Sequence, residues 1–189
     1  MAKIIGVVGS PRRNGNTELL TREALKAAEA EGIETELITL AGKEIKPCDG
    51  CRQCKEKKVD CHIKDDLAPI FHKILKADGL ILATPVYYGS ATAQTKALID
   101  RVGYWSGAYD RPLENKVGAP LVVARRAGQN FTFAQLIFFF FITGMIIPGT
   151  TYWTVAFGRE KGEVAEDEEG ISTAQNLGRK MAWLLKKLN

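Results

Sequence analysis

The chain has 189 residues, 46% of them hydrophobic and 25% charged, which is typical of a soluble globular protein with a single domain over residues 1–189. Its formal net charge of +4 is modest and its basic residues are scattered, so the composition does not indicate a nucleic-acid binder. The longest apolar stretch, residues 136–147, is too short to span a bilayer, and the N-terminus lacks the pattern of a signal peptide. We therefore expect a cytoplasmic protein.

The N-terminal part of the chain predicts a strand, a helix and a second strand. Residues 3–8 are rich in Ile and Val and end at Gly9, which predicts a buried parallel strand. A polar turn follows, and apolar residues at helical spacing then predict a helix over residues 17–31 that ends at Gly32. Residues 33–40 alternate polar and apolar and predict a strand nearer an edge of the sheet.

The alternation resumes after a cysteine-rich segment over residues 47–63. Asp65 or Asp66 can cap a helix that tolerates Pro69 in its first turn. Residues 79–83 predict a third buried strand, and residues 92–102 predict the helix after it.

The C-terminal part predicts two more strands and two more helices. Residues 117–124 predict a fourth strand, which Pro120 is expected to make irregular at its start. Residues 132–144 are apolar nearly all round and predict a helix that is buried or lies in an interface. Residues 152–157 predict a fifth strand, and residues 160–170 an acidic, solvated loop. The apolar face of the last helix consists of Ala174, Leu177, Met181, Leu184, Leu185 and Leu188.

Strands that alternate with helices predict an α/β fold of three layers, with a parallel sheet covered on both faces. Five strands fit the flavodoxin-like order 2-1-3-4-5, with the cysteine-rich insertion after strand two. Such sheets bind ligands at the carboxyl ends of the strands, where the strand order reverses. We therefore expect the loops after strands one, three and four to meet at one site.

The loop over residues 9–17 has the composition of a phosphate cradle. It joins a strand to a helix N-terminus, where free N–H groups and the helix dipole favour an anion. Neither the P-loop lysine nor the dinucleotide glycine spacing is present, and the alternative is a polar turn with a capping Asn or Thr. The residues expected to bind the phosphate are Ser10, Arg12, Asn14, Asn16 and Thr17, with Arg13 as an alternative to Arg12.

Two loops together resemble the flavin loops of the NADPH-dependent FMN reductase and flavodoxin-like superfamily. Residues 9–17 read Gly-Ser-Pro-Arg-x-x-Gly-Asn-Thr and resemble its FMN phosphate loop, and residues 83–90 resemble the loop around the isoalloxazine ring. Residues 95–101 are similar to the helix that follows that loop. The resemblance implies FMN as cofactor, whereas without it residues 83–90 could form an ordinary turn with tyrosines packed on the sheet edge. The remaining residues expected to contact FMN are Thr84, Pro85, Val86, Tyr87, Gly89 and Ser90, with Gly128 closing the pocket.

The four cysteines of the chain, Cys48, Cys51, Cys54 and Cys61, lie at intervals of two, two and six residues. Thiols stay reduced in the cytosol, so a cluster of them indicates metal or redox chemistry. The first three resemble the ligand run of a bacterial-type four-iron cluster. A Cys₄ zinc site, a thiol or disulfide pair without metal, and inert core cysteines are the alternatives. We expect His62 to be a surface neighbour of these cysteines and not a ligand.

The two flavin-type loops and the four-cysteine motif together resemble the iron–sulfur flavoproteins. The resemblance implies a [4Fe-4S] cluster on the four cysteines, and electrons that pass from a small carrier such as a ferredoxin through the cluster to FMN and on to a small oxidant. No side chain is expected to be catalytic, because the flavin carries the chemistry. The alternatives are an NAD(P)H-dependent FMN or quinone reductase without a cluster, and a binding module without redox chemistry.

Two further features bear on partners. Phe138 to Phe141 predict a core or subunit-contact helix, so we expect a homo-oligomer, a dimer or a tetramer, in which one subunit's cluster could approach another's flavin. Lys55, Lys57 and Lys58 surround the cysteines and either attract an acidic electron carrier or form a solvated loop.

Overall fold

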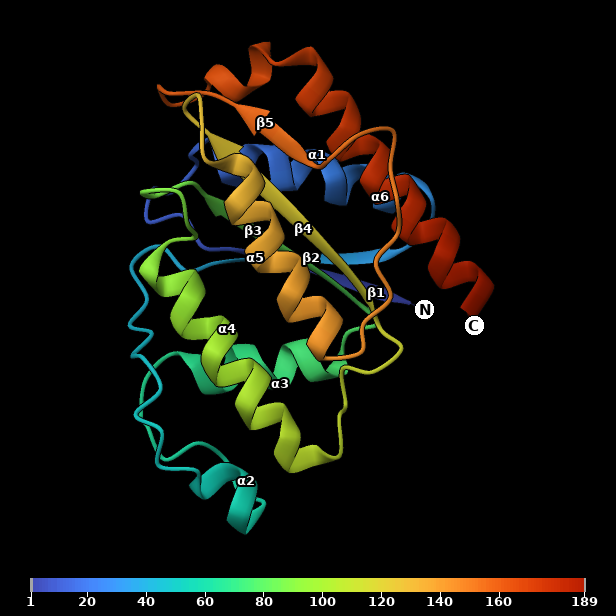
Figure 1. The fold of residues 1–189 in the computed structure, drawn as a ribbon. Coiled ribbons are helices and arrows are strands. Elements are labelled where there is room, and N and C mark those ends of the chain that lie inside the picture. Colours follow the sequence, from blue (N-terminus) through green and yellow to red (C-terminus); the bar gives the residue numbers. More distant parts are fainter. Residues whose placement is uncertain (1, 189) are drawn as a thin grey trace.

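The structure is a computed structural model that describes residues 2–188. Five parallel strands form one sheet in the order β2-β1-β3-β4-β5, as the sequence predicts (Figure 1). The strands are β1 (Lys3–Val8), β2 (Glu34–Thr39), β3 (Gly79–Pro85), β4 (Val117–Ala124) and β5 (Val155–Phe157). Reversal of the strand order beside β1 places the loops after β1 and β3 next to each other.

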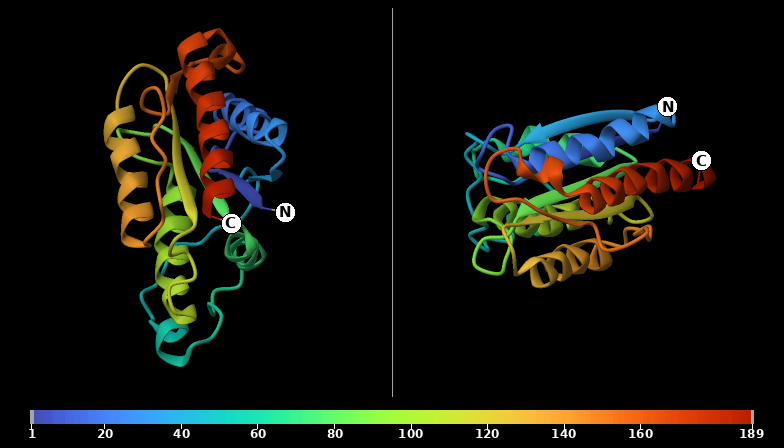
Figure 2. Two further views of the ribbon diagram at one scale, coloured as in Figure 1. Left: turned by 90° about the vertical axis from the view of Figure 1, so that its right-hand side faces the viewer. Right: turned by 90° about the horizontal axis from the view of Figure 1, so that it is seen from above.

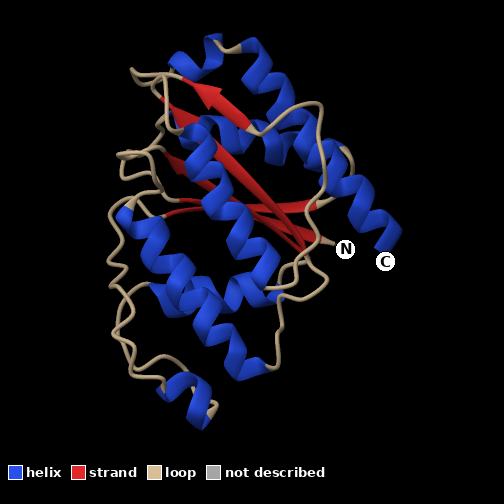
Figure 3. Ribbon diagram, in the orientation of Figure 1, coloured by secondary structure: helices blue, strands red, loops and turns tan. Residues whose placement is uncertain are grey.

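Helices cover both faces of the sheet and complete the three layers (Figures 2 and 3). The helices are α1 (Asn16–Ala30), α2 (Gln53–Lys57), α3 (Leu67–Lys76), α4 (Ala93–Ser106), α5 (Gln129–Ile142) and α6 (Glu168–Leu188), with short 3₁₀ helices η1 (Gly107–Tyr109) and η2 (Glu163–Glu166). The apolar faces of α1 and α6 contribute to one core, and those of α3, α4 and α5 contribute to the other.

The central strands bury both of their faces. In β1, Ile5 and Val7 pack into the core beneath α3, α4 and α5, whereas Ile4 and Val8 pack into the core beneath α1 and α6. Successive side chains of a strand point to opposite faces, so a strand between two helical layers must be apolar at every position. This explains the unbroken apolar runs in the sequence.

Pro120 does not disturb β4, so the predicted irregular start is wrong. It pairs in register with Leu82 of β3. On the opposite edge, the amides of Gly118 and Val122 donate to the carbonyls of Ile146 and Thr154. The amides of residues 118, 120 and 122 all point to this edge, because alternate residues of a strand bond to the same side. The missing N–H of Pro120 therefore lies between the bonds to Ile146 and Thr154.

The C-terminal part differs from the sequence prediction in three places. β5 is shorter than residues 152–157, because the amide of Val155 donates to the carbonyl of Trp153 and turns the chain before the strand begins. Residues 160–170 are not a solvated loop throughout, since they contain η2, whose Val164 is fully buried. Leu188, at the end of α6, is half exposed and does not join the apolar face.

Helix α5 leaves one apolar face uncovered. It begins three residues before the predicted start and buries Leu136, Phe139 and Phe140. Phe138 and Phe141, by contrast, are 70% and 79% exposed. An exposed apolar face of this kind marks an interaction surface. The structure thus agrees with a helix that is only partly in the core, and the subunit contact stays a prediction.

Candidate functional site

The loop after β1 presents an uncapped helix N-terminus. Gly15 is the N-cap of α1, and no side chain among the described residues caps this helix. The loop is stabilised from within, because the amide of Arg12 donates to Ser10 Oγ over 3.2 Å and the amide of Asn14 donates to the Glu18 carboxylate over 2.8 Å. The first N–H groups of a helix need acceptors, and together with the helix dipole they attract an anion.

Asn16 connects this loop to the segment after β5. Its side-chain amide donates to the carbonyl of Glu160 over 2.8 Å, and its side-chain oxygen accepts from the amide of Gly162 over 2.7 Å. A Cβ on Gly158 would lie 2.7 Å from the Asn16 amide nitrogen, so the close approach requires glycine. The side chain of Asn16 is thus bonded within the protein, and it brings Arg159 and Glu160 to the site.

The loop after β3 forms a tight turn beside the first loop. Tyr87 and Ser90 exchange two backbone hydrogen bonds, and Tyr88 and Gly89 between them both have positive φ, 51° and 76°. Two central residues with positive φ are the mark of a type I′ turn. An aromatic residue rarely adopts this conformation, and Tyr88 is fully exposed at the tip. The turn therefore holds one tyrosine beside the pocket and projects the other into solvent.

Buried threonines fix the two loops relative to each other. Thr92 Oγ1, at the N-cap of α4, donates to the carbonyl of Gly9 over 2.7 Å, while its amide donates to Thr84 Oγ1 over 3.2 Å. Thr95 Oγ1 donates to the same oxygen of Thr84. A Cβ on Gly9 would lie 1.7 Å from Thr95 Oγ1, so only glycine fits there. The network locks the end of β1 against the end of β3 and the start of α4.

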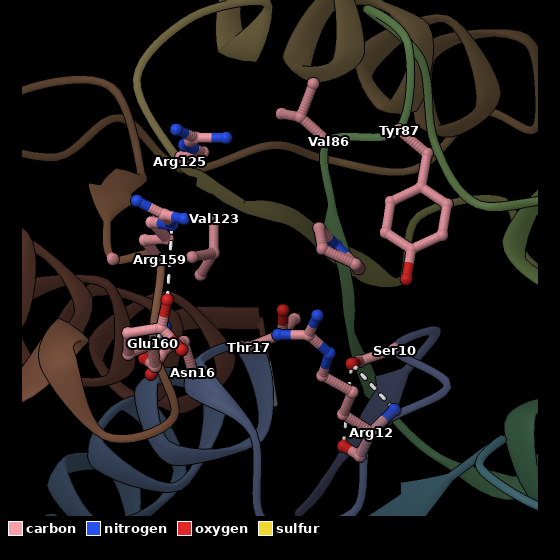
Figure 4. A pocket seen from close by; sticks show the side chains of 12 residues that line it. Ser10, Arg12, Asn16, Thr17, Val86, Tyr87, Val123, Arg125, Arg159 and Glu160 are labelled. Carbon is pink, nitrogen blue, oxygen red and sulfur yellow. Dashed lines mark hydrogen bonds and ion pairs between the residues drawn. The ribbon is translucent and has the colours of Figure 1, made fainter.

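A cavity of about 350 Å³ opens between these loops at the carboxyl ends of the strands. Figure 4 shows guanidinium groups of Arg12, Arg125 and Arg159 reaching it from three different loops, with Tyr87 on the side away from Arg125 and Arg159. Glu160 is the acidic lining residue, and its carboxylate lies 3.2 Å from Arg159 Nε. Three guanidinium groups against one carboxylate leave an excess of positive charge, which suits a phosphate monoester of charge about −1.5 to −2.

The structure brings most of the predicted cofactor residues to this cavity, but not all. Ser10, Arg12, Asn16, Thr17, Pro85, Val86 and Tyr87 line it. Thr84 lies in the threonine network, Ser90 donates to Gln135 over 3.0 Å, and Gly128 packs against Val86 and Gly89. Asn14 and Gly89 do not line the cavity either, and Arg13 lies against Gly42 instead.

The sequence prediction missed four lining residues, Val123, Gly158, Arg159 and Glu160, whereas Arg125 lies in the segment expected after the fourth strand. Gly158, Arg159 and Glu160 directly follow β5. The carboxyl ends of parallel strands share one edge of the sheet, so the position of these residues was a usable signal.

The cysteine segment folds into a compact turn around Cys54. Arg52 and Lys58, which flank α2, adopt the left-handed conformation, as does Gly50 before them. All four thiols are free, with Cys54 buried, Cys61 half-buried, and Cys48 and Cys51 exposed. Burial raises the pKa of Cys54, and the neighbouring charges of Cys61, Cys51 and Cys48 raise it further. The other three thiols therefore lie close enough to Cys54 to affect its pKa.

The chemistry of this donor set fits a soft metal centre. Four thiolates are the ligand set of an iron–sulfur cluster, and also of structural zinc. Within residues 2–188, the one group of three metal-ligating residue types (His, Cys, Asp or Glu) whose ligand atoms all lie within 4.8 Å of one another is Asp49, Cys51 and His62, so the four sulfur atoms are spread more widely than that. All three residues are exposed, and His62 Nε2 is already 2.7 Å from an Asp49 oxygen. His62 thus lies beside the thiols, as expected, and is paired with a carboxylate.

Two buried charges hold the ends of the cysteine segment. The Asp65 carboxylate accepts hydrogen bonds from Arg101 and from the amides of Lys46 and Leu67. Burial alone would favour the neutral acid, but these hydrogen bonds outweigh it and lower the pKa of Asp65. The carboxylate is therefore ionised at neutral pH, and it pairs with Arg101 in the interior.

The cysteine segment and the cavity lie at opposite ends of α4. The N-terminal end of α4 joins the threonine network, whereas α2 contacts the helix near its C-terminal end and η1. Figure 1 accordingly shows α2 at the lower tip of the molecule, apart from the loops at the carboxyl ends of the strands. Arg101 of α4 contacts Cys61 Sγ and lies nine residues after Thr92, so about 14 Å of helix separates the cysteine segment from the threonine network.

Comparisons with known proteins agree with this arrangement. The family model described as NADPH-dependent FMN reductase matches residues 2–160. An iron–sulfur flavoprotein of Methanocaldococcus jannaschii is 44% identical, with 97% of each chain covered, and one of Methanosarcina thermophila is 36% identical, with 97% of this chain and 95% of that protein covered.

Solved structures show the same fold at lower identity. A flavone reductase has a TM-score of 0.78 at 22% identity, covering 98% of this chain and 64% of that one. A WrbA-like flavodoxin from Agrobacterium tumefaciens has a TM-score of 0.66 at 17% identity and is matched over the full length of both chains. Within residues 2–188 no helix is long and apolar enough to cross a membrane.

The match over most of the chain and the identity to the curated relatives both exceed what a shared fold alone would give. The chain therefore belongs to the iron–sulfur flavoproteins, FMN-dependent oxidoreductases within the NADPH-dependent FMN reductase family.

Proposed function

We propose that this protein takes single electrons from a small protein carrier through a [4Fe-4S] cluster on Cys48, Cys51, Cys54 and Cys61, and delivers them through FMN to a small oxidant. The observation that carries the proposal is the presence of four free thiols within one short segment, with Cys54 buried and Cys61 half-buried, in a chain of the FMN reductase family. The names of the curated relatives, iron–sulfur flavoproteins, support it.

The cavity between the β1, β3 and β4 loops is the proposed FMN site. The uncapped N-terminus of α1 and the Arg12 guanidinium would hold the phosphate, with Ser10 and Thr17 beside it. Tyr87 would lie against the flavin ring, and Pro85 and Val86 would exclude water from it. When bound, FMN supplies the exchange of one or two electrons, so no side chain needs to act as an acid or a base.

Exposure of the thiols indicates where a carrier would approach the cluster. Cys54 is buried and Cys61 half-buried, whereas Cys48 and Cys51 are exposed in the segment that precedes α2, the helix at the lower tip of the molecule (Figure 1). A cluster held there would be buried on one side and open on the other. The nearby ammonium groups of Lys55, Lys57 and Lys58 would attract an acidic carrier such as a ferredoxin and speed its encounter.

The separation of the two sites favours a homo-oligomer. About 14 Å of helix α4, from Thr92 to Arg101, lies between the threonine network and the residue that contacts Cys61, and a second subunit would bring another cluster close to the flavin. The exposed Phe138 and Phe141 on α5 offer an apolar surface for such a contact. We propose a dimer or tetramer in the cytoplasm, in which the cluster of one subunit serves the flavin of another.

The test compares two electron donors in wild type and in Cys54→Ala, both loaded with FMN under anoxic conditions. A reduced ferredoxin, which delivers single electrons, should reduce the flavin quickly in wild type and at least tenfold more slowly in the variant. Full retention of bound FMN in both proteins serves as the control for an intact flavin site, and NADPH is the donor that the alternative function would use.

Equal rates with ferredoxin in the two proteins would overturn the proposed route through the cluster. In that case, fast reduction by NADPH in both would favour the reductase without a cluster.

A further inference from the structure

We propose that Arg101 is a positioning residue of the iron–sulfur centre, which holds both ends of the cysteine segment and raises the reduction potential of the cluster. The inference rests on the proposed function, because it needs a cluster on the four cysteines. It concerns a residue of α4 that lies outside the cysteine segment and is not a ligand.

Arg101 and its partner Asp65 form a buried ion pair. The side chain of Arg101 is 1% exposed and that of its partner Asp65 is 0% exposed. Moving an ion pair out of water is costly and often gives no net stability over apolar residues of the same volume. A buried pair of this kind at the edge of a candidate redox centre therefore suggests a role other than stability.

Arg101 contacts the backbone at both ends of the cysteine segment. One terminal nitrogen donates to the carbonyl of Lys46 over 3.1 Å and to Asp65, and the other donates to the carbonyl of Ile63 over 3.4 Å. Lys46 directly precedes the cysteine segment, and Ile63 ends it. A single guanidinium thus fixes the distance between the two ends of the segment, which a planar fork does better than a lysine.

Arg101 also contacts the sulfur of one proposed cluster ligand. Arg101 donates to Cys61 Sγ over 3.4 Å. Its Nε–H is also buried and has no hydrogen-bond partner among the described residues. The guanidinium thus keeps a donor for an acceptor that the chain itself does not supply, as an inorganic sulfide would be.

The hydrogen bond from Arg101 to sulfur and the positive charge of Arg101 both raise the reduction potential. A cluster held by four thiolates becomes more negative on reduction, and hydrogen bonds to its sulfurs together with nearby positive charge favour the reduced state. Arg101 supplies one such bond and a charge in a region of low dielectric. Removing it should lower the potential, whereas removing the countercharge of Asp65 should raise it.

The experiment measures the midpoint potential of the cluster by anoxic redox titration, followed by electron paramagnetic resonance, in FMN-loaded protein. Arg101→Gln should have a lower potential than wild type, Asp65→Asn a higher one, and Arg101→Lys a value between Arg101→Gln and wild type. Arg111→Gln is the matched control, because Arg111 is exposed and pairs with Glu114 on the surface. Its potential should equal that of wild type.

Opposite shifts in Arg101→Gln and Asp65→Asn support the inference, since a purely structural role would lead to cluster loss without such a pattern. Potentials equal to wild type in both variants would overturn it. If Arg101→Gln holds no iron, Asp65→Asn must still lie above Arg101→Lys, and the reverse order would overturn the inference. Wild type without iron and sulfide would instead refute the proposed function.

Discussion

Asn16 gives the sharpest test of how the FMN site is built, because its side chain bonds to the protein and not into the cavity. Removal of the side chain in Asn16→Ala breaks the hydrogen bonds to Glu160 and Gly162. Each neutral hydrogen bond contributes about 0.5–1.5 kcal/mol, so the variant loses about 1–3 kcal/mol of the free energy that holds the loop after β5 in the conformation that lines the cavity. FMN should then bind about 5-fold to 160-fold more weakly.

The assay is titration of the apoprotein with FMN, followed by quenching of flavin fluorescence. Asn14→Gly is the matched control, because Asn14 lies in the same loop, does not line the cavity, and has a φ of 51° that glycine accommodates. Its dissociation constant should stay within about 0.5 kcal/mol of wild type.

Gly158→Ala perturbs the same contact from the other side, so its effect should be less than additive with that of Asn16→Ala. Equal weakening in Asn14→Gly and Asn16→Ala would refute the reasoning, and so would an unchanged affinity in Asn16→Ala.

Two further predictions concern the packing around the sites, and a third concerns the dependence of stability on pH. In Gly9→Ala, the new Cβ would meet Thr95 Oγ1 at 1.7 Å, so urea unfolding should show a loss of about 1–3 kcal/mol or more, with weaker FMN binding; wild-type values for both would contradict the threonine network. Phe71→Ala removes a fully buried ring and should lower the free energy of unfolding by about 3–5 kcal/mol in the same assay, whereas a loss below 1 kcal/mol would contradict the packing.

Hydrogen bonds from Lys73 and a second lysine lower the pKa of Glu36, so its stabilising contribution is complete above the unfolded-state value of about 4.3 and is lost as pH falls through the lower folded-state value. Glu36→Gln should therefore have a lower free energy of unfolding than wild type at neutral pH, and the difference should shrink in acid. A difference that grows in acid would contradict the lowered pKa of Glu36.

The strand order and the meeting of the loops after β1 and β3 could be predicted because their signals are local. Apolar runs of five to eight residues, each followed by a glycine or a polar loop, mark the strands and their carboxyl ends. The doubly wound topology then brings the loops after β1 and β3 together without further information. The four cysteines also lie in one short segment, so the prediction that they share a site needed no knowledge of tertiary contacts.

Other parts of the sites depend on contacts between distant segments. Arg159 and Glu160 reach the cavity because Asn16 bonds to their loop across 144 residues. Arg101 lies in a helix, where an arginine usually faces solvent, and only its partner Asp65, 36 residues earlier in the chain, accounts for its burial. Local periodicity cannot show which polar residue of a helix is buried against a distant carboxylate.

The proposed cluster is held by the sulfur atoms of the four cysteines, Cys54 among them, and its most direct test is a count of iron and acid-labile sulfide in protein purified without oxygen. Wild type should contain about four iron atoms and four sulfides per chain. Cys54→Ala should lose them while it keeps FMN. Wild type with zinc and no sulfide would contradict the account, and so would full iron loading in the variant.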